Sequence, residues 1–380
     1  MKANQSLYQL ETLSFIHIGT GDEVLPPEML LESNRYHRID MASLFQDSQF
    51  DIENYLRHLD SIDAQKLQLS EIDSTTPLNH ILYSMSIGPR LNIKEALTVH
   101  EMIKTARSQL YVPGSSIKGS IFSAIFWDVL SSTSRSNSEV EDFLAAILQR
   151  DYRTIDSLTR NRMFSKFGRI DTQRRGKIDR QLFELLKSFV FEKIGKGSDQ
   201  VKPRLARFLR WLEISDTKSV EITPKTSRVL QIETYNTSRL IPLRFEMLNP
   251  GLKLPFTVSS QQSQMPLTSL FQACDNFYNE VIDAEQKWFK EHNLGGESFH
   301  SKLKKIEGKV RLGQGSGCWT TSLLVLAKEF GLMDEYLDKW KITRYHRKPK
   351  TRKLVQNKRG ERFPLGWARI IPVMESENIT

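Results

Sequence analysis

The sequence predicts an α+β fold, and three observations support this prediction. Residues 6–18 alternate apolar and polar side chains imperfectly, as a half-buried strand does. From Ile117 onward, apolar residues recur every four positions, as they do along one face of a helix. Residues 218–258 are rich in β-branched residues, proline and glycine, which is typical of strands joined by turns. No repeat of roughly 20–50 residues is visible.

The N-terminal part combines strands with helical segments. The first strand is expected to stop at a tight turn over 19–22, where two glycines flank Thr20. Residues 43–105 are polar with scattered helical spacing, and we interpret them as a helical insertion. A short strand at 109–113 is followed by a helix with apolar positions 117, 121, 125 and 129.

The remainder contains helices and one strand-rich segment. Residues 131–139 have few apolar side chains and predict a linker or a mobile loop. Within the strand-rich segment, Asn249, Pro250 and Gly251 predict the turn of a hairpin. Further helices are predicted at 140–148, 182–190, 271–288 and 321–330.

The length of 380 residues is sufficient for two or three domains. We expect an N-terminal core over 1–130 that contains the helical insertion at about 43–105. A helical, basic insertion is expected over 131–215. A C-terminal portion over 216–380 carries a glycine-rich loop and a basic tail.

Positive charge is concentrated in a few segments. Lys and Arg number 54 and Asp and Glu 45, which gives a net charge of +9. Residues 339–362 contain eleven basic residues and one acidic residue, so this tail alone carries +10. A second basic cluster covers 160–180, and a smaller one covers 302–311. Such clusters, interleaved with aromatic residues, favour binding to a phosphate backbone, although any one of them could be a solvated surface.

Several classes of protein are disfavoured. Cys274 and Cys318 form no CxxC pair, so neither a zinc knuckle nor a disulfide framework is indicated. The histidines show no metal-ligand spacing, and we predict neither a metal site nor a cofactor. No signal-peptide pattern and no membrane-spanning apolar run is present, so a cytoplasmic protein without a membrane partner is expected.

The first candidate site is the segment PGSSIKGS at 113–120. Ser115 or Ser116 is expected to cap the following helix, whose free N–H groups would form a seat for an anion. Lys118 adds a positive charge on the first turn. The lysine precedes the second glycine, Gly119, so the segment is not a Walker A loop. A plain capped helix is the alternative.

The second candidate site is RLGQGSGCW at 311–319. Its alternate glycines, Gly313, Gly315 and Gly317, allow the backbone to approach a ligand closely. Their spacing differs from the dinucleotide-binding fingerprint, so the signal is weak alone. The third site is HIGTG at 17–21, where a lone histidine is more often structural than catalytic.

In their order along the chain, HIGTG (17–21), YVPGSSIKGSI (111–121) and RLGQGSG (311–317) resemble the RAMP superfamily of CRISPR RNA-binding proteins. A YRID-like segment at 36–40 and PLGW at 364–367 resemble the terminal backbone subunits of type III-A effector complexes, the family of the fifth Csm subunit. The resemblance extends from about residue 8 to residue 370, and the joint order of the motifs makes it specific.

The resemblance implies a modified ferredoxin-like (RRM-type) core with helical insertions. It implies a backbone subunit that caps the 3′ end of the CRISPR guide RNA in an antiviral ribonucleoprotein and helps set guide length. The implied partners are the 3′ region of the guide, target RNA through the guide duplex, and sister Csm backbone subunits. The residues predicted to contact RNA are His17, Gly19, Gly21, Ser115, Ser116, Lys118, Gly119, Arg311, Gly313, Gly315, Gly317, Trp319, Arg347, Lys348 and Lys350.

Catalysis is not expected. In related repeated backbone subunits an Asp in the loop after the HIG-type turn cuts target RNA, whereas here Asp22 lies inside the turn and Glu28 follows two prolines. The rival hypothesis is a RAMP endoribonuclease that processes repeat RNA, with His17 or His37 as general base. A structural rRNA- or tRNA-binding protein is a third alternative, for which the basic tail would suffice.

Overall fold

The structure is a computed structural model of the chain. It describes residues 4–32, 34–61, 68–88, 98–158, 186, 212–235, 242–260, 267–316, 322–339, 352–356 and 361–373. The basic cluster at 160–180, residues 340–351 of the basic tail, and all of the predicted helix 182–190 except Leu186 lie outside these ranges. Within them, no helix has the length and apolar character needed to cross a membrane.

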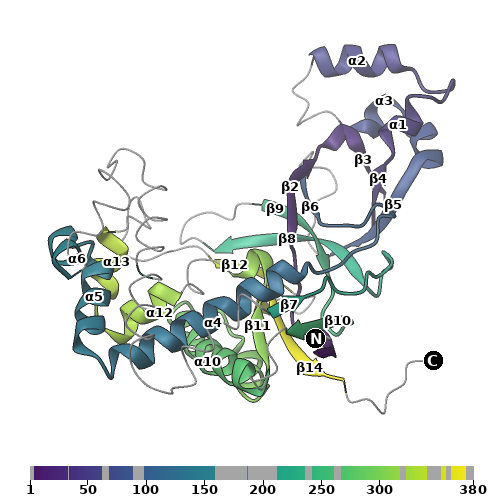
Figure 1. The fold of residues 1–380 in the computed structure, drawn as a ribbon. Helices are drawn as coiled ribbons and strands as arrows, with labels where there is room; N and C mark the ends of the chain where they lie inside the picture. Colours follow the sequence, from purple (N-terminus) through teal and green to yellow (C-terminus); the bar gives the residue numbers. More distant parts are fainter. Residues whose placement is uncertain are drawn as a thin grey trace.

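The first sheet has five antiparallel strands and joins the two ends of the described chain (Figure 1). Its order is β11 (Lys309–Arg311), β14 (Trp367–Pro372), β1 (Asn4–Thr12), β10 (Lys253–Ser260) and β7 (Leu212–Ile214). In β1, Tyr8, Leu10 and Thr12 are buried and alternate with more exposed residues, as the sequence predicts. Leu10 lies opposite Leu254 on one side and Ile370 on the other.

The second sheet mixes antiparallel and parallel pairs. Its order is β2 (Gly19–Val24), β6 (Val99–Met102), β9 (Pro242–Leu248), β8 (Ser227–Tyr235), β5 (Ile81–Ile87), β4 (Arg35–Ile39) and β3 (Met29–Glu32). The β5–β8 and β6–β9 pairs are parallel. Strand β12 (Arg352–Gln356) pairs with β8, and β13 (Arg362–Pro364) pairs with β12.

Two long helices, α4 (Gly114–Ser134) and α10 (Leu267–Glu291), pack against each other and against β11. Figure 1 shows the other helices in two groups at opposite ends of the molecule. Those near α4 are α5 (Ser138–Gln149), α6 (Tyr152–Leu158), α12 (Ser322–Glu329) and α13 (Met333–Lys339). Those beyond β3–β5 are α1 (Met41–Leu44), α2 (Ile52–Ser61) and α3 (Leu69–Ile72). Helix α11 (Glu297–Lys304) contacts α10, and short 3-10 helices occur at Pro26–Glu28, Thr76–His80 and Gly313–Gly315.

The α+β class is confirmed, as are the helices that begin near residues 117, 140, 271 and 321. The helical insertion is shorter than expected. It ends near His80, and Val99–Met102 forms β6, because pairing with β2 and β9 outweighs the scattered helical spacing. The predicted linker over 131–139 is also wrong, since Ser131–Ser134 forms the last turn of α4 and α5 begins at Ser138.

Three turn and strand predictions also need correction. Residues 19–22 are not a turn after the first strand, because β2 starts at Gly19 and runs through them. The expected strand at 109–113 makes only isolated bridges at Leu110. Asn249–Gly251 does turn the chain, but β9 and β10 on either side of it belong to different sheets, so it is not a hairpin.

The three-part division of the chain stays a prediction. Strand β1, from the proposed N-terminal core, lies between β10 and β14, from the proposed C-terminal portion. These two parts therefore share one sheet, and the side chains that line it belong to a single large core.

Candidate nucleic-acid interface

The structure brings the HIGTG and RLGQGSG motifs into direct contact. The backbone amide of Gln314 donates a hydrogen bond to the carbonyl of His17 at 3.0 Å. A Cβ atom added to Gly313 would lie 2.0 Å from the same carbonyl oxygen, and Gly313 has φ of +60°. Only glycine fits this position, because both its backbone conformation and the close approach exclude a side chain.

The PLGW segment at 364–367 joins these two motifs, and we call the place where the three segments meet the junction. A Cβ atom at Gly315 would lie 1.9 Å from the carbonyl oxygen of Leu365. Leu312 donates its amide to Gly366, and Gly366 donates to Phe15, at 2.8 and 2.9 Å. The sequence interpretation assigned Gly313 and Gly315 to close approach of a ligand, whereas in the structure both approach the protein's own backbone. The side of the loop that carries Gly313 and Gly315 therefore packs against the rest of the protein.

The outer side of the junction is open. Gly19, Thr20, Gly21, Gln314 and Ser316 are exposed. Gly21 has φ of +102°, and no atom would contact a Cβ placed on it. Exposed backbone with so little side chain can lie directly against a sugar–phosphate chain.

Lys353 supplies positive charge beside this open surface. Its ammonium group donates to the side-chain oxygen of Gln314 and lies 5.3 Å from the ring centroid of Phe245. Burial lowers the pKa of Lys353 from its ordinary value. His100 stacks on the same ring, with 4.3 Å between ring centroids, so Phe245 holds both basic side chains in place.

His17 lies beneath the surface and points inward. Its side chain is 2% exposed, and Nδ1 donates to the carbonyl of Glu246 at 2.7 Å. Burial lowers the pKa of His17 to about 4, so the imidazole is neutral near pH 7. The side chain therefore shapes the junction from inside, and we exclude it from the proposed contact surface.

A fully buried carboxylate, Glu246, fastens the strands below His17. It accepts hydrogen bonds from the hydroxyl of Tyr83 at 2.7 Å and from the amide of Met102 at 3.0 Å. The ammonium of Lys104 lies 2.5 Å from Oε2 of Glu246, the oxygen that also accepts from Met102. Because each oxygen is satisfied, this charge can remain buried and hold β6 against β9 beside β2.

A second buried carboxylate, Glu285 of α10, positions the glycine-rich loop. Arg311 at the end of β11 pairs with Glu285 at 2.8 Å and donates its Nε to the carbonyl of Leu365 at 3.1 Å. The indole of Trp367 donates to Glu285 at 3.2 Å, and His300 lies 3.4 Å from the same oxygen. Arg311 was predicted to contact RNA, but its side chain is buried in this network and is not available at the surface.

The PGSSIKGS segment joins the other motifs through Ser120. The amide of Arg311 donates to the hydroxyl of Ser120 at 3.2 Å, and this hydroxyl also bonds that of Tyr278 at 2.6 Å. The start of α4 is thereby fixed next to the strand that leads into the glycine-rich loop.

The expected serine cap of α4 is absent. The N-cap residue is Pro113, and neither Ser115 nor Ser116 bonds the helix start as a cap; instead, Asp216 accepts from the amide of Gly114 at 2.8 Å. Lys118 donates to the carbonyl of Leu212 at 2.6 Å. A carboxylate from another part of the chain therefore takes part of the expected anion seat.

Two other residues predicted to contact RNA, Ser115 and Gly119, lie at the surface. Both are exposed on α4, and no atom lies within 4 Å of a Cβ placed on Gly119. The remaining predicted residues fall outside the described ranges and stay predictions; they are Gly317, Trp319, Arg347, Lys348 and Lys350.

Sequence reasoning missed Glu246, Glu285 and Asp216. A weak signal existed for Glu285, which follows Val281 by four positions and so interrupts the apolar stripe of α10 with an acid. No motif marks Glu246 or Asp216, because their partners lie far away in the sequence.

Comparison with known proteins agrees with this architecture. The sequence profile of the RAMP superfamily matches residues 9–366. No curated protein matches the sequence. One similar solved structure is a chain of a Csm–crRNA–target RNA ternary complex of a type III-A CRISPR-Cas system, with a TM-score of 0.64 and 21% identity, covering 96% of this chain and 100% of that one.

Csm5 from T. onnurineus is similar to the same degree, with a TM-score of 0.64 and 21% identity over 95% of this chain and 99% of that one. At this identity the likeness concerns the fold, which the two structures share with this chain along almost its entire length. The profile match covers the motifs that meet at the junction, from HIGTG to the glycine of PLGW. The chain belongs to the RAMP superfamily.

Proposed function

We propose that the chain is a guide-RNA-binding backbone subunit of a type III-A (Csm) effector complex, in which it caps the 3′ end of the CRISPR RNA and helps set guide length. The proposed partners are the 3′ region of the guide, target RNA through the guide duplex, and sister Csm subunits. Similar folds in a Csm–crRNA–target RNA complex and in Csm5 support this assignment.

The observation that carries the proposal is the meeting of HIGTG, RLGQGSG and PLGW at one junction. The hydrogen bond from Gln314 to His17 and the close approach of Gly315 to Leu365 fix its inner side. Its outer side presents exposed backbone at Gly19–Gly21 together with Lys353. Backbone donors and a lysine bind phosphates without reading bases, which suits a subunit that must accept guides of any sequence.

A role in holding RNA fits the groups at this junction better than a role in cutting it. A general base needs access to a 2′-hydroxyl and a pKa near the working pH. His17 has a pKa of about 4, is buried, and has its Nδ1 engaged with a main-chain carbonyl. The Glu28 carboxylate accepts from the amide of Leu25 at 2.9 Å, within its own 3-10 turn.

The test is co-expression of the chain with sister Csm subunits, followed by purification through a tag on this chain and sequencing of the bound RNA. We expect one short RNA class whose 3′ region crosslinks to this subunit. Recovery of random cellular RNA, or of no sister subunit, would contradict the proposal. RNA cleavage that disappears in His17→Ala, Asp22→Ala or Glu28→Ala while assembly persists would show that the subunit is a nuclease.

A further inference from the structure

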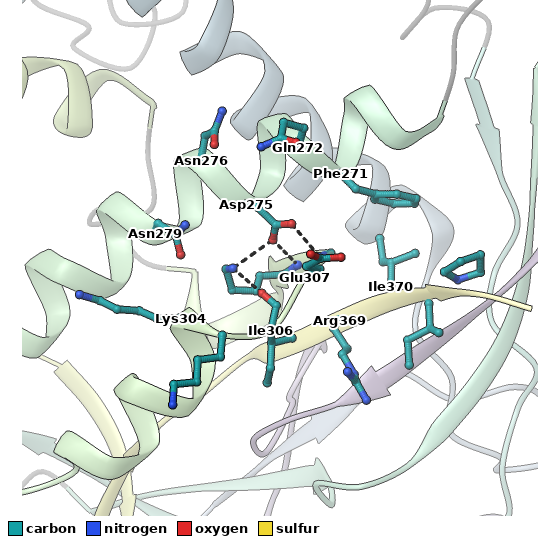
Figure 2. A pocket seen from close by; sticks show the side chains of 15 residues that line it. Phe271, Gln272, Asp275, Asn276, Asn279, Lys304, Ile306, Glu307, Arg369 and Ile370 are labelled. Atoms are coloured by element: carbon teal, nitrogen blue, oxygen red, sulfur yellow. Dashed lines mark hydrogen bonds and ion pairs between the residues drawn. The ribbon is translucent and has the colours of Figure 1, made fainter.

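A cavity of about 810 Å³ lies between α10, the end of α11 and β14 (Figure 2). It sits at the start of β11, and the glycine-rich loop follows the other end of this strand. Three residues of strand separate the two sites, a span of about 10 Å. The volume is in the range of pockets that hold small organic ligands or nucleotides.

One wall of the cavity consists of amide side chains. Gln272, Asn276 and Asn279 line it from α10, at spacings of four and three residues, so they share one face of the helix. The opposite face of α10 is in the core, where Phe277 and Tyr278 are buried. Gln272 and Asn276 are exposed, so the fold does not require their amides.

Asn279 adds a more specific signal. Its side-chain oxygen is buried and has no hydrogen-bond partner among the residues that the structure describes. An unsatisfied buried acceptor is costly, so an N–H group from a ligand in the cavity would gain a strong partner there.

The floor of the cavity is rigid and electrically compensated. Asp275 accepts from the amides of Gly308 and Lys309 at 3.0 and 3.1 Å. Its carboxylate also lies 3.1 Å from the ammonium of Lys309, which is almost fully buried. Asp275 and Lys309 at the floor therefore neutralise each other. The charge of a ligand in the cavity must be matched by residues at the rim.

The rim of the cavity carries two exposed lysines. Four basic residues and two acidic residues line the cavity; they are Lys304, Lys305, Lys309, Arg369, Asp275 and Glu307. Arg369 pairs with Glu11, and Lys304 pairs with Asp283 in an ion pair that is exposed and therefore weak. Lys304 and Lys305 are exposed at the end of α11, and they belong to the basic group that the sequence shows at 302–311. These two lysines are therefore available to an anionic ligand.

We propose that this cavity holds nucleotides of the single-stranded RNA that passes the glycine-rich loop. Lys304 and Lys305 contact its phosphates, and the amides of Gln272, Asn276 and Asn279 hydrogen-bond the edges of its bases. An acidic peptide could also pair with these amides through its backbone, but the cavity lies one short strand from the glycine-rich loop that the proposed function places on RNA, which favours RNA as the occupant. The inference rests on the proposed function, and it adds a second RNA contact that engages the bases as well as the phosphates.

The phosphate contacts are tested on the full chain by fluorescence anisotropy with labelled single-stranded oligoadenylate. We expect Lys304→Ala with Lys305→Ala to weaken binding on the order of tenfold, and to make the log–log salt slope shallower by about 1.4, since each phosphate contact contributes about 0.7. The control is Lys287→Ala with Lys290→Ala, which removes the same charge from exposed positions of α10 that do not line the cavity. The control should bind within about twofold of the wild type.

The base contacts need a second comparison. Wild-type protein should bind oligoadenylate more tightly than an abasic oligomer of equal length. Gln272→Ala with Asn276→Ala should remove this difference while the melting temperature is kept, because both side chains are exposed on a helix that tolerates alanine.

The outcomes separate the two proposals. If the wild type binds RNA and neither cavity variant changes binding, the cavity is not an RNA site, and the proposed function stands. If the wild type binds no RNA, alone or with sister subunits, the proposed function fails. If Lys304→Ala with Lys305→Ala leaves RNA binding intact but releases a sister subunit, the cavity holds a peptide and the inference is overturned.

Discussion

The guanidinium of Arg311 lies 2.8 Å from the carboxylate of Glu285, and both side chains are almost fully buried. This pair connects the middle of α10 to the residue that leads into the glycine-rich loop. A pair of this kind costs free energy to desolvate, so its main effect is to fix which groups may meet. Here it holds Arg311 where its Nε reaches the PLGW backbone.

Removing one partner of this pair should strongly destabilise the folded chain. We expect Glu285→Ala to lower the free energy of unfolding by about 3–5 kcal/mol, because the charge of Arg311 stays buried without its partner. Urea denaturation of the full chain measures the loss. Glu285→Leu combined with Arg311→Met should lose less than Glu285→Ala alone. An equal or greater loss in the double variant would contradict the role given to the unpaired charge.

Two glycines in the junction should respond differently to alanine. Gly315→Ala places a Cβ 1.9 Å from the Leu365 carbonyl oxygen, and we expect it to destabilise the chain by about 3 kcal/mol or more. Gly21→Ala meets open space and is penalised only by its positive φ, at about 1–2 kcal/mol. Thermal unfolding should rank the two in this order, and the reverse order would show that the loop does not pack as described.

Gly119→Ala should affect the stability of the chain and its binding to RNA in opposite directions. Gly119 lies in the interior of α4 with open space around its Cβ position, so Gly119→Ala should stabilise the chain by about 0.5–1 kcal/mol. If RNA or a sister subunit lies against this helix, the same methyl group should weaken that association. Melting temperature and RNA retention measure the two effects. A variant that gains stability and retains RNA fully would remove Gly119 from the predicted contacts.

His17 should make stability depend on pH. Its pKa falls from an unfolded value near 6.5 to about 4 in the folded chain, so the unfolded state binds more protons between these values. The stabilisation is complete above about pH 6.5 and is lost as the pH falls toward 4, by up to about 3 kcal/mol. Urea denaturation between these pH values should show a shallower dependence in His17→Gln than in the wild type. Parallel curves would contradict this assignment.

The fold class was predictable because local patterns survive in the structure. The alternation of β1 and the apolar stripe of α10 are set by burial on one side, and burial is visible in the sequence. Strand β6 was missed because four residues are too few to show a period. The separation of β9 and β10 into different sheets depends on partners more than two hundred residues away, such as Thr12, which bonds the carbonyl of Asn249.

The candidate site was predicted in part. The three glycine-containing motifs predicted where the site lies, because glycine is required where two backbones approach closely. They did not show whether the backbone that approaches each glycine belongs to RNA or to the protein itself. Gly313 and Gly315 face protein, whereas Gly21 is open; Gly19 is exposed, but a Cβ on it would lie 2.8 Å from Nε2 of His17. The partners of the buried acids Glu246 and Glu285 could not be inferred, because a single acid in a sequence carries no information about which distant residues will neutralise it.

The central position of β1 has a consequence for synthesis of the chain. This strand is made before both of its neighbours in the sheet, β10 and β14, and its end at Thr12 is tied to Asn249 across 237 residues. At about 5–20 residues per second, a ribosome needs about 12–50 s to bridge that gap. During this time both edges of β1 lack their partners, and such edges are prone to pair with other chains. The newly made chain should therefore depend on chaperones until β14 has emerged, and slower translation should lengthen that dependence.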